Sequence, residues 1–419
     1  MTDRLYYRDS FLYDFDAEVR ELTVGSRLGV ILDRTVFYPT SGGQVFDTGW
    51  IIPADSAKDE AKFRVSEVAD MEDGRVVHYL EAPLHDPQTD GLRPGMRVRG
   101  QVDATRRRDH MQQHSGQHVL SAAFLRLFNM PTVSFHMAED YCSIDLDTPA
   151  LTREQIESAE RLANEIILEN RVVDIRLVTR GEAEKLGLRK VPPAERDELR
   201  LIDIRDFDLT ACGGTHVNQT GQIGCVLLRK SEMVRQGGRV EFVAGHGAVA
   251  VARSDFTALT ETASLFSANI YDVLQQARKS LDEIKSLRKE REQVEEELAA
   301  AQAATLLAET PERDGRKIVI RIFPDRELNF IKLLAQRVTR LSPNVVALLA
   351  TTSPQPSVVF AQSAGQPFDM GTKMKEAMAK LGGRGGGSKD MAQGGVKQAG
   401  GIDATLADVG AELGRSRML

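Results

Sequence analysis

The stretch RRDHMQQHSGQHVL, Arg107 to Leu120, decides how the centre of this sequence folds. It lies within residues 103–129, where apolar side chains recur at helical spacing, so a helix is predicted there. His114 and His118 are four residues apart, which places both imidazoles on one helical face with their Cβ atoms ~6 Å apart. The stretch therefore predicts a helix that carries two candidate metal ligands.

A second stretch, CGGTHV at Cys212–Val217, offers two more ligands. Cys212 and His216 flank a turn that is too rich in glycine for a helix, so both side chains can face one atom. One thiolate and three imidazoles are ligand types that suit Zn²⁺. We predict a zinc site formed by His114, His118, Cys212 and His216. The alternative is a buried structural cysteine and unrelated histidines.

The patterns on either side of this helix predict an α+β fold in four parts. These are a β-rich N-terminal subdomain (1–100), a zinc-binding core (101–250), a helical connector or coiled coil (251–310) and a small α/β C-terminal domain (311–419). Strands are predicted in the first part at 22–24, 29–32, 35–38, 49–52, 63–68 and 76–80.

The later parts follow the same reasoning. The core should add a hairpin at 134–146, a helix at 152–169 that begins with a Thr-x-x-Gln capping box, and strands at 172–178, 199–207, 223–230 and 239–244. Residues 255–309 contain no proline, and one long helix is predicted there. The C-terminal domain should contain strands at 317–323, 344–351 and 357–361 and helices at 327–341, 370–381 and 402–413.

Composition limits the classes of protein that remain. The chain has 419 residues, of which 42% are hydrophobic and 27% charged, and its formal net charge is −7. A polyanionic partner must therefore be met by a local basic patch. The first ten residues lack the apolar stretch of a signal peptide, and no apolar run is long enough to span a bilayer, so we expect a cytoplasmic protein without membrane contact. Three cysteines are too few for a disulfide framework.

With these stretches, Thr35–Gly49 (TVFYPTSGGQVFDTG) and Ser134–Asp147 (SFHMAEDYCSIDLD) resemble the editing domain of alanyl-tRNA synthetase and its free-standing AlaX relatives. Gly382–Gly395 (GGRGGGSKDMAQGG) is similar to the glycine-rich signature of the DHHA1-type domain that ends those synthetases. The resemblance spans nearly the whole chain, as in the long AlaX form, and nothing like the aminoacylation domain precedes it.

The resemblance implies that the chain hydrolyses mischarged Ser-tRNA(Ala), with Gly-tRNA(Ala) as a second candidate substrate, in trans. A pocket built for alanine cannot exclude the smaller glycine and rejects an added hydroxyl only weakly, so a second, hydrolytic sieve is needed. Two alternatives stay open: a zinc hydrolase of another aminoacyl ester, and a non-catalytic zinc-stabilised tRNA-binding module. The zinc could be catalytic or only orienting, although four protein ligands leave no open position.

The same resemblance suggests the site residues. The predicted catalytic set is Thr35, Gln44, His114 and His118. We assign the serine hydroxyl to Thr35 and Gln44, and we expect further substrate contacts from Gly42, Gly43, His136 and Arg107. His110 is left open as a packed or solvated residue, a neighbour of the tRNA terminus or a ligand.

The partners expected are mischarged tRNA(Ala) and a second copy of the chain, which would pair through the helical connector or the C-terminal domain. ATP is not expected, because the glycine run at 382–387 leads into Gly-Ser-Lys, where the nucleotide-binding motif requires Gly-Lys-Ser/Thr.

Overall fold

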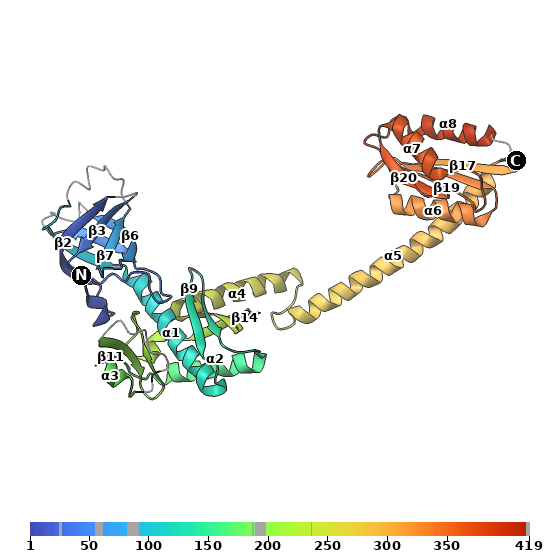
Figure 1. The fold of residues 1–419 in the computed structure, drawn as a ribbon. Helices are drawn as coiled ribbons and strands as arrows, with labels where there is room; N and C mark the ends of the chain where they lie inside the picture. The colour runs from blue at the N-terminus through green and yellow to red at the C-terminus, as the bar shows by residue number, and fades with distance from the viewer. Residues whose placement is uncertain are drawn as a thin grey trace. The chain divides into compact units, whose positions relative to one another are not determined.

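The computed structural model describes residues 1–24, 27–54, 62–81, 92–186, 188, 198–235 and 237–415. The chain divides into two compact units, Met1–Glu261 and Thr262–Leu419. Figure 1 shows the elements of each unit.

A closed barrel forms the N-terminal part of the first unit. Its strands follow one another around the barrel as β2 (Asp14–Val24), β3 (Leu28–Leu32), β7 (Val76–Leu80), β6 (Phe63–Asp70), β5 (Gly49–Pro53) and β8 (Arg97–Val102). Fully buried aliphatic and aromatic side chains fill its interior, among them Val19, Val30, Phe37, Ile51 and Val65. Beside the barrel lie a short parallel pair, β1 (Asp3–Arg4) and β4 (Arg34–Thr35), and the 3₁₀ turn η1 (Leu5–Tyr7).

Helix α1 (Ala104–Phe128) follows the barrel and is the centre of the rest of the unit. One antiparallel sheet beside it has the order β14 (Val226–Val234), β15 (Gly237–Ala244), β10 (Cys142–Leu146) and β9 (Thr132–Met137). A second sheet contains β11 (Val173–Thr179), β12 (Glu198–Ile204) and β13 (Asp208–Ala211). The remaining elements are α2 (Arg153–Leu168), α3 (Arg180–Ala183), η3 (Thr220–Ile223) and α4 (Gly245–Leu265).

The ends of α1 and α2 follow from their sequences. The Asp103 carboxylate accepts hydrogen bonds from two amides in the first turn of α1, and Asn129 ends that helix in the left-handed conformation (φ 53°). The capping box predicted at the start of α2 is confirmed, because Thr152 and Gln155 bond each other's backbone amides.

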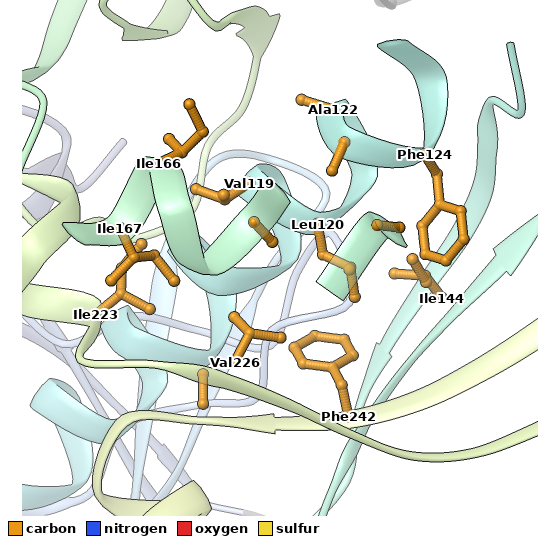
Figure 2. Packing of buried hydrophobic residues seen from close by; sticks show 14 of the residues in the cluster. Val119, Leu120, Ala122, Phe124, Ile144, Ile166, Ile167, Ile223, Val226 and Phe242 are labelled. Atoms are coloured by element: carbon orange, nitrogen blue, oxygen red, sulfur yellow. The ribbon is translucent and has the colours of Figure 1, made fainter. Parts of the chain in front are cut away.

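The middle of α1 is buried at every position from His110 to Phe124. Its apolar residues pack with α2, β10, β14 and β15 into the cluster drawn in Figure 2. Gly116 permits the close approach of the sheet, since a Cβ atom there would lie 3.0 Å from the Cβ of Ala244. Because so many polar side chains of α1 are buried, each needs a partner within the protein.

The second unit contains α5 (Val273–Glu309). It also contains a sheet with strand order β16 (Glu312–Arg313), β17 (Arg316–Phe323), β18 (Val345–Thr351), β19 (Ser357–Gln362), β21 (Met391–Gly395) and β20 (Arg384–Gly387). Helix α6 (Leu328–Leu341) and the end of α5 pack on one face of the sheet. Helices α7 (Met370–Leu381) and α8 (Ile402–Arg415) cover the other. Strand β18 is buried at every position, as expected for a strand covered on both faces.

The single helix predicted over 255–309 is wrong. The structure has two helices, α4 and α5, because Ser267 adopts a left-handed conformation (φ 49°) and the Ala268 amide bonds back to the Ala263 carbonyl (3.0 Å). The Asn269 side chain then accepts the Tyr271 amide (3.1 Å). A helix end closed by serine and asparagine, without glycine or proline, escapes the usual stop signals.

The strand predicted at 35–38 is also wrong beyond Thr35. The amide of Phe37 donates to the Thr35 hydroxyl (3.0 Å), and the amide of Tyr38 donates to the Asp47 carboxylate (2.7 Å). Side chains thus take the hydrogen bonds that a neighbouring strand would otherwise accept. The glycine run near 382–387 was not predicted as a strand, yet it forms β20, which pairs with β21.

None of the helices in the described part of the chain is both long enough and apolar enough to span a bilayer.

Candidate metal centre

The four residues predicted as zinc ligands lie together in the structure. One ligand atom from each of His114, His118, Cys212 and His216 lies within 4.8 Å of the others. The Cys212 Sγ is 3.4 Å from Nε2 of His114 and 3.4 Å from Nε2 of His216. Two ligands come from α1 and two from the turn after β13, so the centre joins segments almost one hundred residues apart in the sequence.

The donor set and its spacing fit Zn²⁺. Tetrahedral zinc with ordinary Zn–S and Zn–N bonds requires sulfur–nitrogen separations of about 3.6 Å, close to the 3.4 Å observed here. Burial raises the pKa of the Cys212 thiol, but His114 and His216 beside it outweigh this and hold the pKa well below its usual value. Burial likewise keeps the pKa of His216 well below its usual value. Thiolate and neutral imidazole are the forms that bind metal.

The other nitrogen of each imidazole faces a side chain that can orient the ring. His114 Nδ1 is 2.7 Å from Gln44 Oε1, and His216 Nδ1 is 3.3 Å from the Ser115 hydroxyl. His118 Nδ1 lies 3.5 Å from an Asp208 carboxylate oxygen. Partners of this kind fix the tautomer so that Nε2 is left for the metal.

Gln44 has the best defined of these contacts. Its Oε1 also accepts the Thr215 amide (3.1 Å), and its Nε2 donates to the Thr215 hydroxyl (2.9 Å), so the orientation of its amide is settled by the backbone. Since Oε1 can only accept, His114 Nδ1 must carry the proton. Gln44 therefore links the loop after β4 to both halves of the centre.

Replacing Gln44 by leucine should weaken zinc binding roughly tenfold to a hundredfold, because His114 loses the acceptor that fixes its tautomer. Competition with a chelator of known affinity would measure this. Gln44→Glu retains an acceptor at the same distance and should bind zinc nearly as well as the wild type. Equal affinity for wild type and Gln44→Leu would show that Gln44 does not position His114.

Thr35, predicted to contact the serine hydroxyl, is fully buried in the barrel. Its hydroxyl is 2.8 Å from His78 Nε2, and it also accepts the Phe37 amide. His78 Nδ1 is 2.9 Å from the Val30 carbonyl oxygen, so that nitrogen carries the proton and Thr35 donates to Nε2. Burial lowers the pKa of His78 to about 4, so the ring is neutral at neutral pH. Both predicted serine contacts, Thr35 and Gln44, thus already have protein partners.

Arg107, predicted to contact substrate, is completely buried as well. Its Nε is 3.1 Å from an oxygen of Asp47, another fully buried residue, and its other nitrogens donate to the Ser10 and Val36 carbonyls. The Arg107 guanidinium has no exposed surface, and its hydrogen bonds to these acceptors hold the barrel to α1. We therefore propose a structural role for Arg107, and its predicted contact with substrate stays a prediction.

The remaining predicted contacts lie around the same loop. Gly42 and Gly43 have positive φ angles of 58° and 88° in a tight turn, and a Cβ atom on Gly43 would lie 2.3 Å from the Phe135 carbonyl oxygen. The Phe135 ring stacks on His114, with centroids 5.3 Å apart. His136 is exposed on β9, so its predicted role in lining the substrate pocket stays a prediction.

Several residues of the centre were not predicted. Thr215 and Ser115 lie inside the two sequence motifs, so their presence near the centre could have been predicted. Their hydrogen-bond partners could not. Arg200 donates to the carbonyls of Cys212 (2.6 Å) and Tyr7 (2.9 Å) and thereby fixes the start of the ligand turn. Nothing in the sequence around Arg200 marks it for this role.

Comparison with known proteins gives three domain matches. Residues 4–106 match the tRNA synthetases class II (A) family, residues 199–239 match the threonyl and alanyl tRNA synthetase second additional domain, and residues 315–414 match the DHHA1 domain.

Curated relatives match the chain along nearly its whole length. An alanine–tRNA ligase from Methanothrix thermoacetophila is 31% identical over 100% of this chain and 45% of its own length. One from Thermococcus kodakarensis is 32% identical over 94% of this chain and 42% of its own length. The alanyl-tRNA editing protein AlaX-L from Pyrococcus horikoshii is 28% identical over 95% of both chains. The chain therefore spans about half the length of the ligases it matches.

Two of these matches indicate the class of protein. The second additional domain of the threonyl and alanyl synthetase type includes Cys212 and His216 of the candidate metal centre, and the DHHA1 domain lies in the second unit. Along nearly its whole length the chain is similar to the alanyl-tRNA editing proteins and to the matching half of the alanine–tRNA ligases. Among the relatives named above, the AlaX-L protein is the one matched over almost its full length.

Proposed function

We propose that this chain is a trans-editing hydrolase that removes serine from mischarged Ser-tRNA(Ala), with Gly-tRNA(Ala) as a second substrate. The observation that carries the proposal is the buried centre of His114, His118, Cys212 and His216 in a chain matched end to end by an AlaX-L protein. The reaction breaks an already activated ester, so catalysis needs a positioned water, a base and stabilisation of the oxyanion.

The metal in this proposal is Zn²⁺. His114, His118, Cys212 and His216 would hold it, and four protein donors are the pattern of structural zinc sites, whereas catalytic sites keep one position open. Zinc bound there would hold α1 and the 212–216 turn together and shape the walls of the adjoining site. The protein's own side chains then supply the proton transfer.

Deacylation assays test the proposal directly. Purified protein should release serine from Ser-tRNA(Ala) much faster than alanine from Ala-tRNA(Ala), and serine on tRNA(Ser) should be spared. Hydrolysis of all three esters at similar rates would favour a general aminoacyl esterase. Binding of tRNA without hydrolysis would favour the non-catalytic module, and either result would overturn the proposal.

Thr35→Val should lower the free energy of unfolding by about 2 kcal/mol, because it leaves the His78 Nε2 atom and the Phe37 amide without partners. We expect it to slow hydrolysis of the seryl and glycyl esters alike, since the change acts through the barrel. Thr35→Ser keeps the hydroxyl and is the matched control. A loss confined to the seryl ester would instead support the direct contact with serine predicted from the sequence.

We also propose a homodimer formed through α5. That helix leaves a stripe of large apolar side chains exposed: Leu281, Ile284, Leu287 and Val294 are each 45–61% exposed. Apolar residues in such a row on a long helix are typical of pairing with another helix.

A further inference from the structure

One histidine of the first unit has no role in what has been described. The sequence contains eight histidines, of which His85 lies outside the described residues. Three belong to the metal centre, and His78 is held inside the barrel by Thr35 and Val30. His136 and His246 are exposed at the surface. His110 is left, one helical turn before His114 on α1 and only 4% exposed.

His110 lines a cavity of about 780 Å³ in the first unit. Its walls come from the loop after β4, the first half of α1, the turn between β9 and β10, and the start of α4. Charged groups of both signs line it, including Arg106, Asp109 and Glu139. The volume suits a ligand of the size of an aminoacylated nucleoside. None of the four metal-binding side chains lines it, although Val45 and Gln113, neighbours of Gln44 and His114, do.

One edge of the His110 ring faces Asp47. Its Nδ1 atom is buried, lies 3.8 Å from a carboxylate oxygen of Asp47, and has no hydrogen-bond partner among the described residues. Asp47 is itself held by Arg107 and the Tyr38 amide, so its position does not depend on His110. Because Nδ1 faces Asp47, Nε2 is the ring nitrogen left for the cavity that His110 lines.

We infer that His110 is the general base for ester hydrolysis in this cavity, with Asp47 as the group that orients it. The inference rests on the proposed function. Many active sites use a base to align a nucleophile or a water molecule, and a carboxylate to align that base. If the protein supplied all four zinc ligands, no position would be left for a metal-bound water, and a side chain would have to act as the base.

The step can be written with each proton placed. The lone pair of His110 Nε2 takes a proton from water as the water oxygen bonds to the ester carbonyl carbon. The bond from that carbon to the ribose oxygen then breaks, and His110 returns the proton to the ribose oxygen. The products are free serine and tRNA with an unmodified terminal ribose. Burial lowers the pKa of His110 to about 4 against the opposing effect of Asp47, so the ring is neutral and able to accept a proton at neutral pH.

The test compares His110→Ala and His110→Gln with the wild type in single-turnover hydrolysis of Ser-tRNA(Ala) at saturating enzyme. Both variants should be slower by roughly 10²-fold to 10⁴-fold, the usual contribution of a positioned base, while tRNA affinity and zinc content stay the same. Added imidazole should restore at least tenfold in His110→Ala, whose cavity has room for it. His110→Gln fills that space and should not respond.

His246→Ala is the matched control, because His246 is exposed and does not line the cavity. It should hydrolyse at the wild-type rate and ignore imidazole. Full activity in both His110 variants would overturn the inference while leaving the proposed function intact. Loss of activity that imidazole does not restore, together with loss of zinc, would assign His110 a structural role and also overturn it. An inactive wild type would overturn the proposed function and this inference together.

Discussion

Cys212→Ala is expected to reduce the zinc content from about one ion per chain to less than about a tenth of that. The thiolate is the only anionic donor of the centre, and it lies 3.4 Å from Nε2 atoms of two of the three imidazoles. Without it, three buried imidazoles remain, and their combined affinity is far below that of a four-donor set with sulfur. Elemental analysis of the purified variant measures the loss.

The same variant should also lose stability in the first unit, since metal-binding free energy contributes directly to folding when the site is structural. A chelator should bring the wild type down to the melting temperature of Cys212→Ala and leave the variant unchanged. Cys225→Ala is the control, because Cys225 is a partly buried cysteine outside the cluster and should leave zinc content unaltered. Full zinc occupancy in Cys212→Ala would refute the site.

The sequence was sufficient to predict that these four side chains gather because each pair lies within one local element. A spacing of four on a helix and a glycine turn are local geometries, and the two motifs each specify one. The predicted closeness of the two pairs is confirmed by the cluster. The partners that orient the ligands were not predictable in the same way. Gln44 and Arg200 reach the centre from two other segments, and Asp208, on the strand just before Cys212, contacts His118 of α1, so only the tertiary fold brings these partners to their ligands.

Arg107 shows what a local sequence pattern cannot reveal about one side chain. Arg106, Arg107 and Arg108 are consecutive at the start of α1, and a sequence pattern does not reveal which of them is buried. Arg107 is fully buried, Arg106 is half-buried and Arg108 is exposed. The deciding feature is Asp47, sixty residues earlier, whose carboxylate needs a buried cation. A run of arginines in the sequence therefore does not show which side chains are buried and which are exposed.

Arg107→Ala should lower the free energy of unfolding of the first unit by about 3–5 kcal/mol. The side chains of Arg107 and Asp47 have no exposed surface. Removing the guanidinium therefore leaves the Asp47 carboxylate buried, and among the described residues only the Tyr38 amide still donates a hydrogen bond to it. The Ser10 and Val36 carbonyls lose their donor at the same time. Trp50, the only tryptophan in the chain, lies on β5 of the barrel, so its fluorescence during urea unfolding reports on this unit.

Arg108→Ala is the matched control, since this neighbouring arginine is exposed, and its free energy of unfolding should stay within about 0.5 kcal/mol of the wild type. Adding Asp47→Asn to Arg107→Ala removes the stranded charge and should recover part of the loss, because much of the cost of breaking a buried pair is the unpaired ion that remains. If Arg107→Ala kept wild-type stability but bound tRNA more weakly, Arg107 would be a substrate contact after all, as its sequence suggested. Because both side chains are buried, we expect Arg107→Ala to lower the free energy of unfolding and to change tRNA affinity only as a consequence of that loss.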